Sequence, residues 1–155
     1  MGKVEDTIVE RLDKKIKGII LESEDELKLL EESLDLLSDF VFIRKNDGQI
    51  ILKEKAFTLP VKTRILIVML ARFIGYKINE IYSNLKNKII FQGIDDPSLE
   101  FKEIIQLSGT KKGTASGVLS NYLKSGIIKK ISKAKYIVAN FQLAILSLKK
   151  QLERR

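Results

Sequence analysis

The sequence predicts a mainly helical α+β fold with small β hairpins. Apolar residues recur at three- and four-residue spacing over most of the chain, which is typical of amphipathic helices. An aspartate-glycine step separates two β-prone runs, and a lysine-rich extended region follows two further helical segments. The 155 residues suffice for one domain with an appended element, and a hydrophobic fraction of 45% suffices for a core.

Two helices are expected at the amino terminus. The first runs from Val4 to Ile20 with Ile8, Leu12, Ile16 and Ile19 on one face. Ser23 and Glu26 have the spacing of a capping box, which indicates a new helix start. The second helix then carries a stripe of Leu27, Leu30, Leu34 and Leu37. The pair either packs on the main domain or meets its copy in a second chain, because two heptads are too few to indicate a coiled coil.

A β hairpin is expected next, with strands at about residues 40–45 and 49–54. The turn between them is Asn46-Asp47-Gly48, and glycine tolerates the positive φ that such turns require. A lone glycine favours this turn over a ligand-binding loop.

The longest helix is expected to begin at Pro60, with Thr58 as its cap, and to be mostly buried. Gly75 marks its expected end, and residues 76–85 continue as a second helix or a bent extension. A short strand is predicted over residues 86–91 and a loop over residues 93–97, after which Ser98 caps the following helix.

Residues 98–138 have the pattern of helix, tight turn, helix and hairpin. The first helix covers about residues 99–107, and Ser108-Gly109-Thr110 forms the turn. The second covers about residues 112–124, with Ala115, Leu119 and Tyr122 or Leu123 facing inward, and Ser125-Gly126 ends it. The hairpin consists of residues 127–131, a turn at 132–134, and residues 135–138. Asn140 then caps a last helix from Phe141 to Leu152, whose apolar face serves the core or a dimer.

Charge divides the chain into two unlike parts. The first 60 residues hold 14 acids and 10 bases, whereas residues 61–155 hold 6 acids and 18 bases. No acidic residue occurs between Glu103 and Glu153. Lysines on a solvated surface are ordinarily interspersed with acids. Their absence between Glu103 and Glu153 therefore indicates that this part of the chain is attracted to a polyanion.

Residues 102–138 resemble the winged helix-turn-helix DNA-binding domains of bacterial and archaeal transcription regulators. Glu103-Ile104-Ile105 matches the "E-I-A" helix, Thr114 to Leu119 the recognition helix, and Tyr122 to Ile128 the "L-x-x-x-G-L-I" segment before the wing. The resemblance implies a winged helix over about residues 58–152 and a recognition helix that enters the major groove. We therefore expect residues 58–155 to form this domain, with residues 1–57 as a helical and hairpin extension for dimerisation, an effector or a partner protein.

Double-stranded DNA is thus the expected partner, and a homodimer the expected state. The candidate DNA-binding residues are Lys111, Lys112, Thr114, Ser116, Gly117, Ser120, Asn121, Lys124, Lys129, Lys130, Lys133 and Lys135. Asn121 suits adenine, but Gly117 stands where relatives often carry a long polar side chain. No arginine lies between Arg72 and Arg154, so phosphate contacts with weak or AT-leaning sequence preference are expected. For Tyr136, packing on the core is favoured over stacking on a base.

Other classes of function have less support in the sequence. The absence of cysteine and histidine removes thiol and imidazole catalysis and the usual zinc sites, and the carboxylates lack a catalytic motif. We therefore expect no enzyme, cofactor or metal site. No membrane span or signal sequence is evident, and a cytoplasmic location is expected. The alternative function is a winged-helix adaptor between proteins of a transcription, replication or trafficking complex.

Overall fold

The computed structural model describes residues 3–154, and within the first helix it describes the side chains of residues 8–12 and 25–37. The chain divides into two units, Met1–Glu32 and Ser33–Arg155. The fold is α+β and mostly helical, with two small antiparallel sheets. The boundary that the sequence predicts at residue 57 stays a prediction.

The first helix, α1, is continuous from Lys3 to Leu37. The prediction of two helices was wrong, because the helix passes through residue 23 without a break. A serine is tolerated inside a helix at modest cost, so a Ser-x-x-Glu spacing alone does not start a new one.

The predicted hairpin is confirmed. Strand β1 (Val41–Ile43) pairs antiparallel with β2 (Ile50–Leu52), in the register Phe42 opposite Ile51. Gly48 in the turn has φ 72°, and the Cβ of any other residue would come within 2.5 Å of the Gln92 carbonyl oxygen. Glycine at this position therefore permits both the turn and its contact with the loop at residues 91–94.

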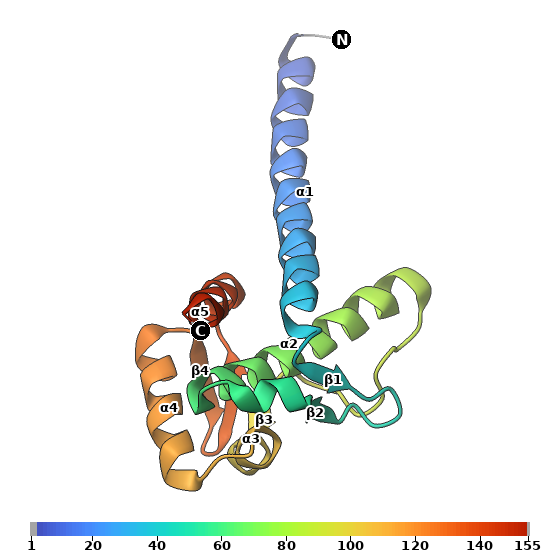
Figure 1. The fold of residues 1–155 in the computed structure, drawn as a ribbon. Helices are drawn as coiled ribbons and strands as arrows, with labels where there is room; N and C mark the ends of the chain where they lie inside the picture. The colour runs from blue at the N-terminus through green and yellow to red at the C-terminus, as the bar shows by residue number, and fades with distance from the viewer. Residues whose placement is uncertain (1–2, 155) are drawn as a thin grey trace. The chain divides into compact units, whose positions relative to one another are not determined.

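The central element is α2 (Val61–Lys86), which runs through the middle of residues 33–155 (Figure 1). All seven residues from Ile65 to Ala71 are buried, so the helix is covered on every side. The hairpin, α3, α4, α5 and β5 all contact it. Such a helix is the nucleus of the core, as the run of apolar residues predicts.

Two expected boundaries of this helix were wrong. Thr58 is not its cap, because residues 54–58 form a short 3-10 helix, η1 (Glu54–Thr58), and Pro60 precedes the first turn of α2. Gly75 does not end it either, since Gly75 is helical and buried. A Cβ there would lie 2.7 Å from Ile94 Cδ1, so the glycine gives space to the neighbouring loop.

The strand predicted at residues 86–91 does not form. Buried Asn79 of α2 binds this segment instead, because its Oδ1 accepts hydrogen bonds from the backbone N–H groups of Ile90 and Phe91. Its Nδ2 donates to the Phe91 carbonyl oxygen at 2.8 Å. These backbone groups are thereby occupied by one side chain and are unavailable for strand pairing. The loop predicted at residues 93–97 is confirmed.

The second sheet has the strand order β3-β5-β4. It is built from β3 (Leu99–Glu100), β4 (Ile128–Ser132) and β5 (Lys135–Val138), with β4 and β5 as the predicted hairpin. Helices α3 (Phe101–Ser108) and α4 (Lys112–Ser125) precede the hairpin, and α5 (Phe141–Glu153) follows it. The predicted cap at Asn140 is confirmed, since its Oδ1 accepts from Leu143 N at 3.0 Å.

Ser98 is not the cap of α3, contrary to the prediction. Glu100 precedes the helix and forms a reciprocal capping box with Glu103. Ser98 instead donates its hydroxyl hydrogen to the Asp96 carboxylate, and this bond helps to hold the pKa of Asp96 below its usual value. The two-residue strand β3 separates Ser98 from the helix, a feature too short to leave a pattern in the sequence.

A polar network ties α2, α4 and α5 together. Tyr122 Oη donates to the Lys62 carbonyl oxygen at 2.6 Å and accepts from Gln151 Nε2 at 3.1 Å. Gln151 Oε1 in turn accepts from Thr63 Oγ1 at 2.6 Å. Burial raises the pKa of Tyr122 to about 12, so the hydroxyl stays protonated and available as a donor at neutral pH.

Replacing Asn79 with alanine should lower the free energy of unfolding by about 2 to 4 kcal/mol, because backbone groups of residues 90 and 91 lose partners in a partly buried site. Urea denaturation of both proteins measures the change. Asn84→Ala is the matched control, since Asn84 is exposed on the same helix and should change stability by less than about 0.5 kcal/mol. Equal effects of the two substitutions would contradict this role of Asn79.

Candidate nucleic-acid interface

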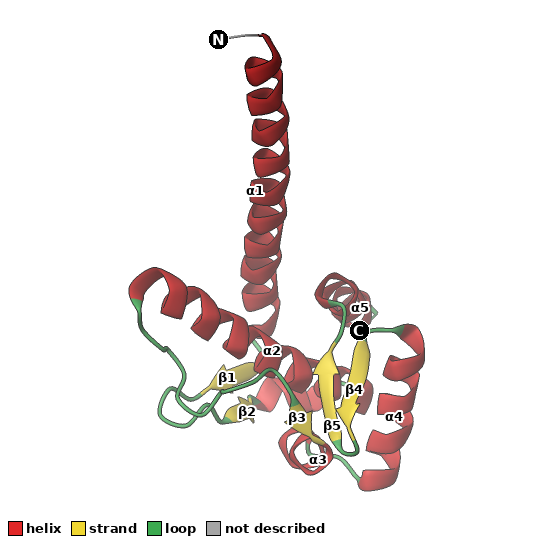
Figure 2. Cartoon of the chain, turned by 180° about the vertical axis from the view of Figure 1, so that it is seen from behind, coloured by secondary structure: helices red, strands yellow, loops and turns green. Residues whose placement is uncertain are grey.

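Helix α4 with the residue before it, and the β4–β5 hairpin, together carry all the candidate residues. Figure 2 shows β4 beside α4, with the turn of the hairpin at the same end as the first turn of α4. This arrangement follows from the short connection at Gly126, whose φ of 80° ends α4 and turns the chain back antiparallel. The first turn of the helix and the tip of the hairpin therefore lie close to each other, at the same end of α4.

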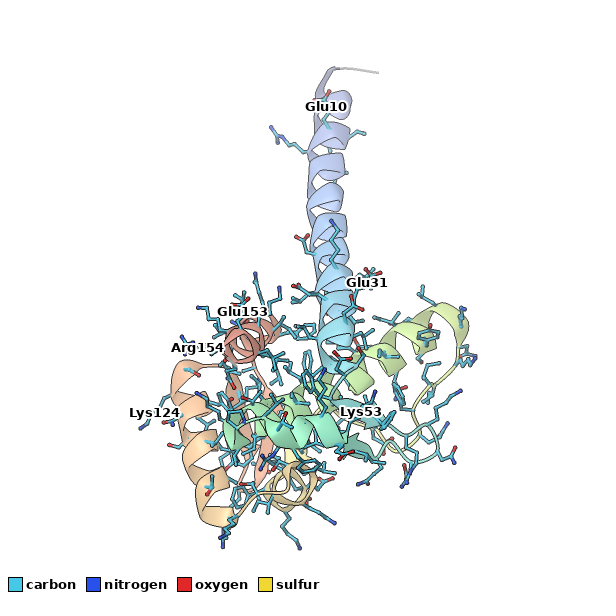
Figure 3. The ribbon with its side chains drawn as sticks, viewed as in Figure 1. Glu10, Glu31, Lys53, Lys124, Glu153 and Arg154 are labelled. Carbon is cyan, nitrogen blue, oxygen red and sulfur yellow. The ribbon has the colours of Figure 1, made fainter. Side chains whose placement is uncertain are left out.

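One side of α4 is buried and the other is open. Ala115, Leu119 and Tyr122 face the core, as the sequence predicts. The candidate residues of this segment are all exposed: Lys111, Lys112, Thr114, Ser116, Gly117, Ser120, Asn121 and Lys124. Figure 3 shows Lys124 projecting outward from the helix. The structure thus brings these residues together on one accessible helix.

Two glycines lie on the open side of α4. A Cβ added at Gly113 or Gly117 would meet no atom within 4 Å, and both residues have helical backbone. Neither packing nor backbone conformation therefore requires glycine there, although glycine costs a helix about 1 kcal/mol relative to alanine. The fold alone does not explain these residues. Because these two positions have no side chain, another molecule can approach the backbone of α4 closely there.

The start of α4 is electropositive. Lys111 is the residue before the first turn, and no side chain caps the helix. The first N–H groups of a helix carry partial positive charge, and the exposed ammonium groups of Lys111 and Lys112 add to it. A helix start of this kind favours an anion such as phosphate.

The lysines of the hairpin do not share one face. Lys130 is paired with Tyr136, and its Nζ lies 5.6 Å from the centre of the Tyr136 ring. Lys129 is adjacent in the strand and so points to the opposite face. Lys133 is exposed in the turn. These three are accessible, but from two sides of the hairpin.

Lys135 is the least available of the candidate residues. It is half-buried and lies opposite Glu100 across the β3–β5 pair. Residues 104–152 contain no acid, but the structure places one beside them, because β3 brings Glu100 next to Lys135 of β5. Sequence reasoning could not foresee this pairing.

Ile131 is a candidate that the sequence reasoning missed. Its side chain is 50% exposed among the hairpin lysines, and strand pairing is irregular between Lys130 and Ser132. The only signal in the sequence was the position of Ile131, three residues after the buried Ile128. In a strand, residues three apart point to opposite faces, so Ile131 does not share the buried face. Tyr136, in contrast, is buried beside Phe101, in agreement with the prediction that it packs on the core.

The β1–β2 hairpin leaves α4 open. It packs on α2 and α3, within the unit of residues 33–155. A cover over α4 would favour the adaptor function, because the predicted recognition surface would then already be occupied. The part of the chain that the structure describes in this unit contains no such cover.

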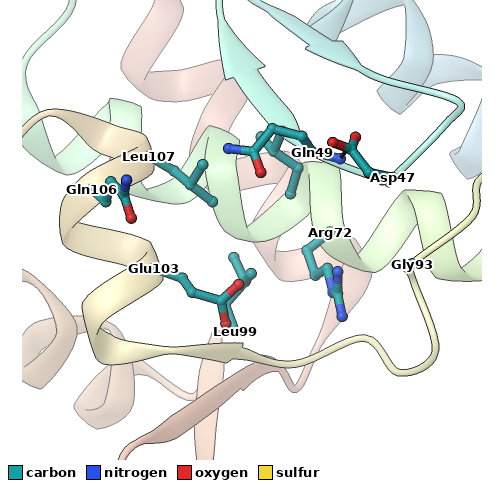
Figure 4. Close-up of a pocket in the computed structure, with 10 residues that line it drawn as sticks. Asp47, Gln49, Arg72, Gly93, Leu99, Glu103, Gln106 and Leu107 are labelled. Atoms are coloured by element: carbon teal, nitrogen blue, oxygen red, sulfur yellow. Dashed lines mark hydrogen bonds between the residues drawn. The ribbon is translucent and has the colours of Figure 1, made fainter.

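A separate polar pocket of 190 Å³ lies between the hairpin, α2 and α3 (Figure 4). Gln49, Arg72 and Glu103 line it, and Arg72 Nε also donates to the Asp96 carbonyl oxygen at 2.9 Å. Asp47 at its rim is bound by Arg44, which lowers its pKa to about 2. None of the candidate residues lines this pocket.

Among the side chains that the structure describes, no group of three or more acidic residues is arranged to hold a metal ion. Every buried polar side-chain atom described has a hydrogen-bond partner. None of the described helices combines the length and apolar composition that crossing a membrane requires.

Comparisons of the chain with protein-family models, curated proteins and solved structures found no match.

Substituting Gly117 with alanine should raise the free energy of unfolding by about 0.5 to 1 kcal/mol, because the methyl group meets open space and the helix gains propensity. Chemical denaturation measures the gain, and Gly113→Ala should behave alike. Gly48→Ala is the contrasting variant, since its Cβ would lie 2.5 Å from the Gln92 backbone carbonyl oxygen and its φ is 72°, and it should lose stability. A loss at Gly117 equal to that at Gly48 would show that the fold itself needs this glycine.

Proposed function

We propose that this protein binds double-stranded DNA through a winged helix-turn-helix, as a transcriptional regulator or chromosome-associated factor. Helix α4 is the recognition helix, and the β4–β5 hairpin is the wing. The order of α2, α3, α4, β4 and β5, with β3 completing a three-stranded sheet, supports this proposal because winged helices use this succession of elements.

The observation that carries the proposal is the concentration of accessible lysines at one end of α4 and on the wing. Lys111 and Lys112 are exposed at an uncapped helix start, and Lys133 is exposed in the hairpin turn at the same end. Phosphates of a duplex satisfy the helix N–H groups and the ammonium groups at once. A solvated surface without a polyanionic partner has no need of this concentration of charge.

The same residues favour backbone contacts over base reading. Lysine is a point charge that binds phosphate well, whereas arginine is the commoner bidentate reader of guanine. The open side of α4 has Gly113 in its first turn and Gly117 one turn further on, where long polar side chains are absent. Asn121 is the residue best suited to a base, and it pairs with adenine. Binding is therefore dominated by phosphate contacts, with a weak or AT-leaning preference.

The exposed Ile131 fits this mode of binding. Proteins that contact the minor groove often combine basic side chains with an apolar side chain that packs on sugars or between base edges. Ile131 lies between Lys130 and the wing turn, so it supplies the apolar part beside the basic part.

Replacing Lys112, Lys129 and Lys130 with glutamine should weaken binding to mixed-sequence duplex DNA. It should also flatten the slope of log affinity against log salt concentration by about 3. Each phosphate contact that is lost lowers the number of counterions released on DNA binding by roughly one. Fluorescence anisotropy over a range of salt concentrations measures both quantities. Circular dichroism should show unchanged folding, since all three side chains are exposed.

The matched control replaces three exposed lysines outside α4 and the wing, Lys45, Lys55 and Lys88, with glutamine. It changes the net charge equally, but it should leave the salt slope within error of the parent protein. If both variants lose the same affinity, binding depends on net charge alone and not on α4 and the wing. If the parent protein fails to bind duplex at micromolar concentration and low salt, the proposed function is wrong.

The adaptor function is the second candidate, and a surface other than α4 favours it. Phe42 and Ile51 form an exposed cross-strand pair on the β1–β2 hairpin, and exposed Phe57 of η1 follows shortly after in the chain. Exposed aromatic side chains of this kind are common where proteins bind other proteins. If DNA binding survives substitution of Phe42 and Phe57, these two residues do not contact DNA. A protein-binding role for them would then belong to a surface separate from α4 and the wing.

A further inference from the structure

The continuity of α1 changes what its sequence implies. A single helix of 35 residues is about 50 Å long and holds about five heptads, whereas two separate helices hold only two each. A long helix with few tertiary contacts is marginally stable in water unless a partner covers its apolar face. Residues 1–32 form a unit of their own, in which α1 is the only element described.

The amino-terminal part of that apolar face is exposed where the structure describes it, whereas Leu30 and Leu37 farther along the helix are buried. Leu12 is 52% exposed and Leu27 is 49% exposed, and Ile8 and Val9 are exposed to a similar degree. The sequence has Ile16 and Ile19 at the same three- and four-residue spacing between them. A stripe of this length and regularity is suited to packing against another helix.

The charges of α1 are divided between its two halves. Residues 11–17, RLDKKIK, contain four bases and one acid, whereas residues 22–32, ESEDELKLLEE, contain six acids and one base. Among the described side chains, Arg11 is exposed in the basic segment, and Asp25, Glu26 and Glu31 are exposed in the acidic one. Figure 3 shows Glu31 projecting from the helix. The best electrostatic complement of this helix is the same helix in the opposite direction.

We propose that α1 pairs with α1 of a second copy of this chain to form an antiparallel two-helix homodimer. In the alignment that places Leu12 opposite the partner's Leu27, residue 14 faces residue 25 and residue 17 faces residue 22 of the second helix. The basic segment of each copy then lies along the acidic segment of the other. A parallel, in-register pair would place like charges together, which disfavours it.

The arrangement closes on itself. In a two-fold symmetric dimer each contact occurs twice, so one Leu12–Leu27 contact and its charged surroundings are repeated at both ends of the interface. This explains why one segment carries excess base and the other excess acid, a division that packing within a single chain does not require. The pairing uses only residues of the first unit and does not depend on the proposed DNA binding.

Cysteine cross-linking tests both the pairing and its direction. The chain has no cysteine, so Leu12→Cys and Leu27→Cys introduce the only thiols. Under mild oxidation an equimolar mixture of the two variants should form a covalent heterodimer, identified by mass, as its main product. Each variant alone should stay largely uncross-linked, because residue 12 faces residue 27 and not its own copy.

Strong cross-linking of Leu12→Cys with itself would overturn the antiparallel direction. Sedimentation equilibrium of the full chain without DNA supplies an independent readout. The parent protein should be dimeric at micromolar concentration, and Lys14, Lys15 and Lys17→Glu should dissociate it. Restoring opposite charge in the same chain, by Glu22, Glu24 and Asp25→Lys, should recover the dimer. A monomeric parent protein, or failure of the second set to recover the dimer, would refute the proposal without bearing on DNA binding.

Discussion

The complete burial of α2 is the constraint on which the rest of residues 33–155 depends. A helix with seven consecutive buried residues must be covered on all sides, and no single sheet or helix can do so. The chain covers it with the β1–β2 hairpin, α3, α4, α5 and β5. The outer faces of these covering elements are free to differ, and this is where the accessible lysines lie.

Polar contacts along α2 fix the orientation of what covers it. Arg64 donates from Nε to the Ser108 carbonyl oxygen at 3.0 Å and from Nη1 to that of Leu59 at 2.9 Å, which ties the end of α3 and the chain before Pro60 to the helix. Asn79 holds the loop at residues 90–91, and Tyr122 with Gln151 joins α4 and α5 to the start of α2. Burial of apolar side chains supplies the stability, and these hydrogen bonds select one arrangement of the elements that cover α2.

Periodicity and turn chemistry predicted the elements that depend on local sequence. The Asp47-Gly48 turn, the end of α4 at Gly126 and the Asn140 cap were foreseen because one or two residues decide each of them. The errors occurred where distant residues decide. Asn79 removed the expected strand at residues 86–91, and Gly75, expected to end α2, is a buried helical residue that leaves space for Ile94 of the neighbouring loop. The exposed residues of α4 followed from its helical period, whereas the pairing of Lys135 with Glu100 required the β3–β5 register.

The proposed function requires that DNA contact the first turn of α4 and the wing, chiefly through phosphates. Titration of the ¹⁵N-labelled protein with a short mixed-sequence duplex, followed through the backbone amide signals, measures where DNA binds. The largest shifts are expected at residues 111–114 and 129–133, with the amides of Asn79 and the β1–β2 hairpin unchanged. Shifts concentrated on the β1–β2 hairpin or the polar pocket, or no shifts at low salt, would rule out this mode of binding.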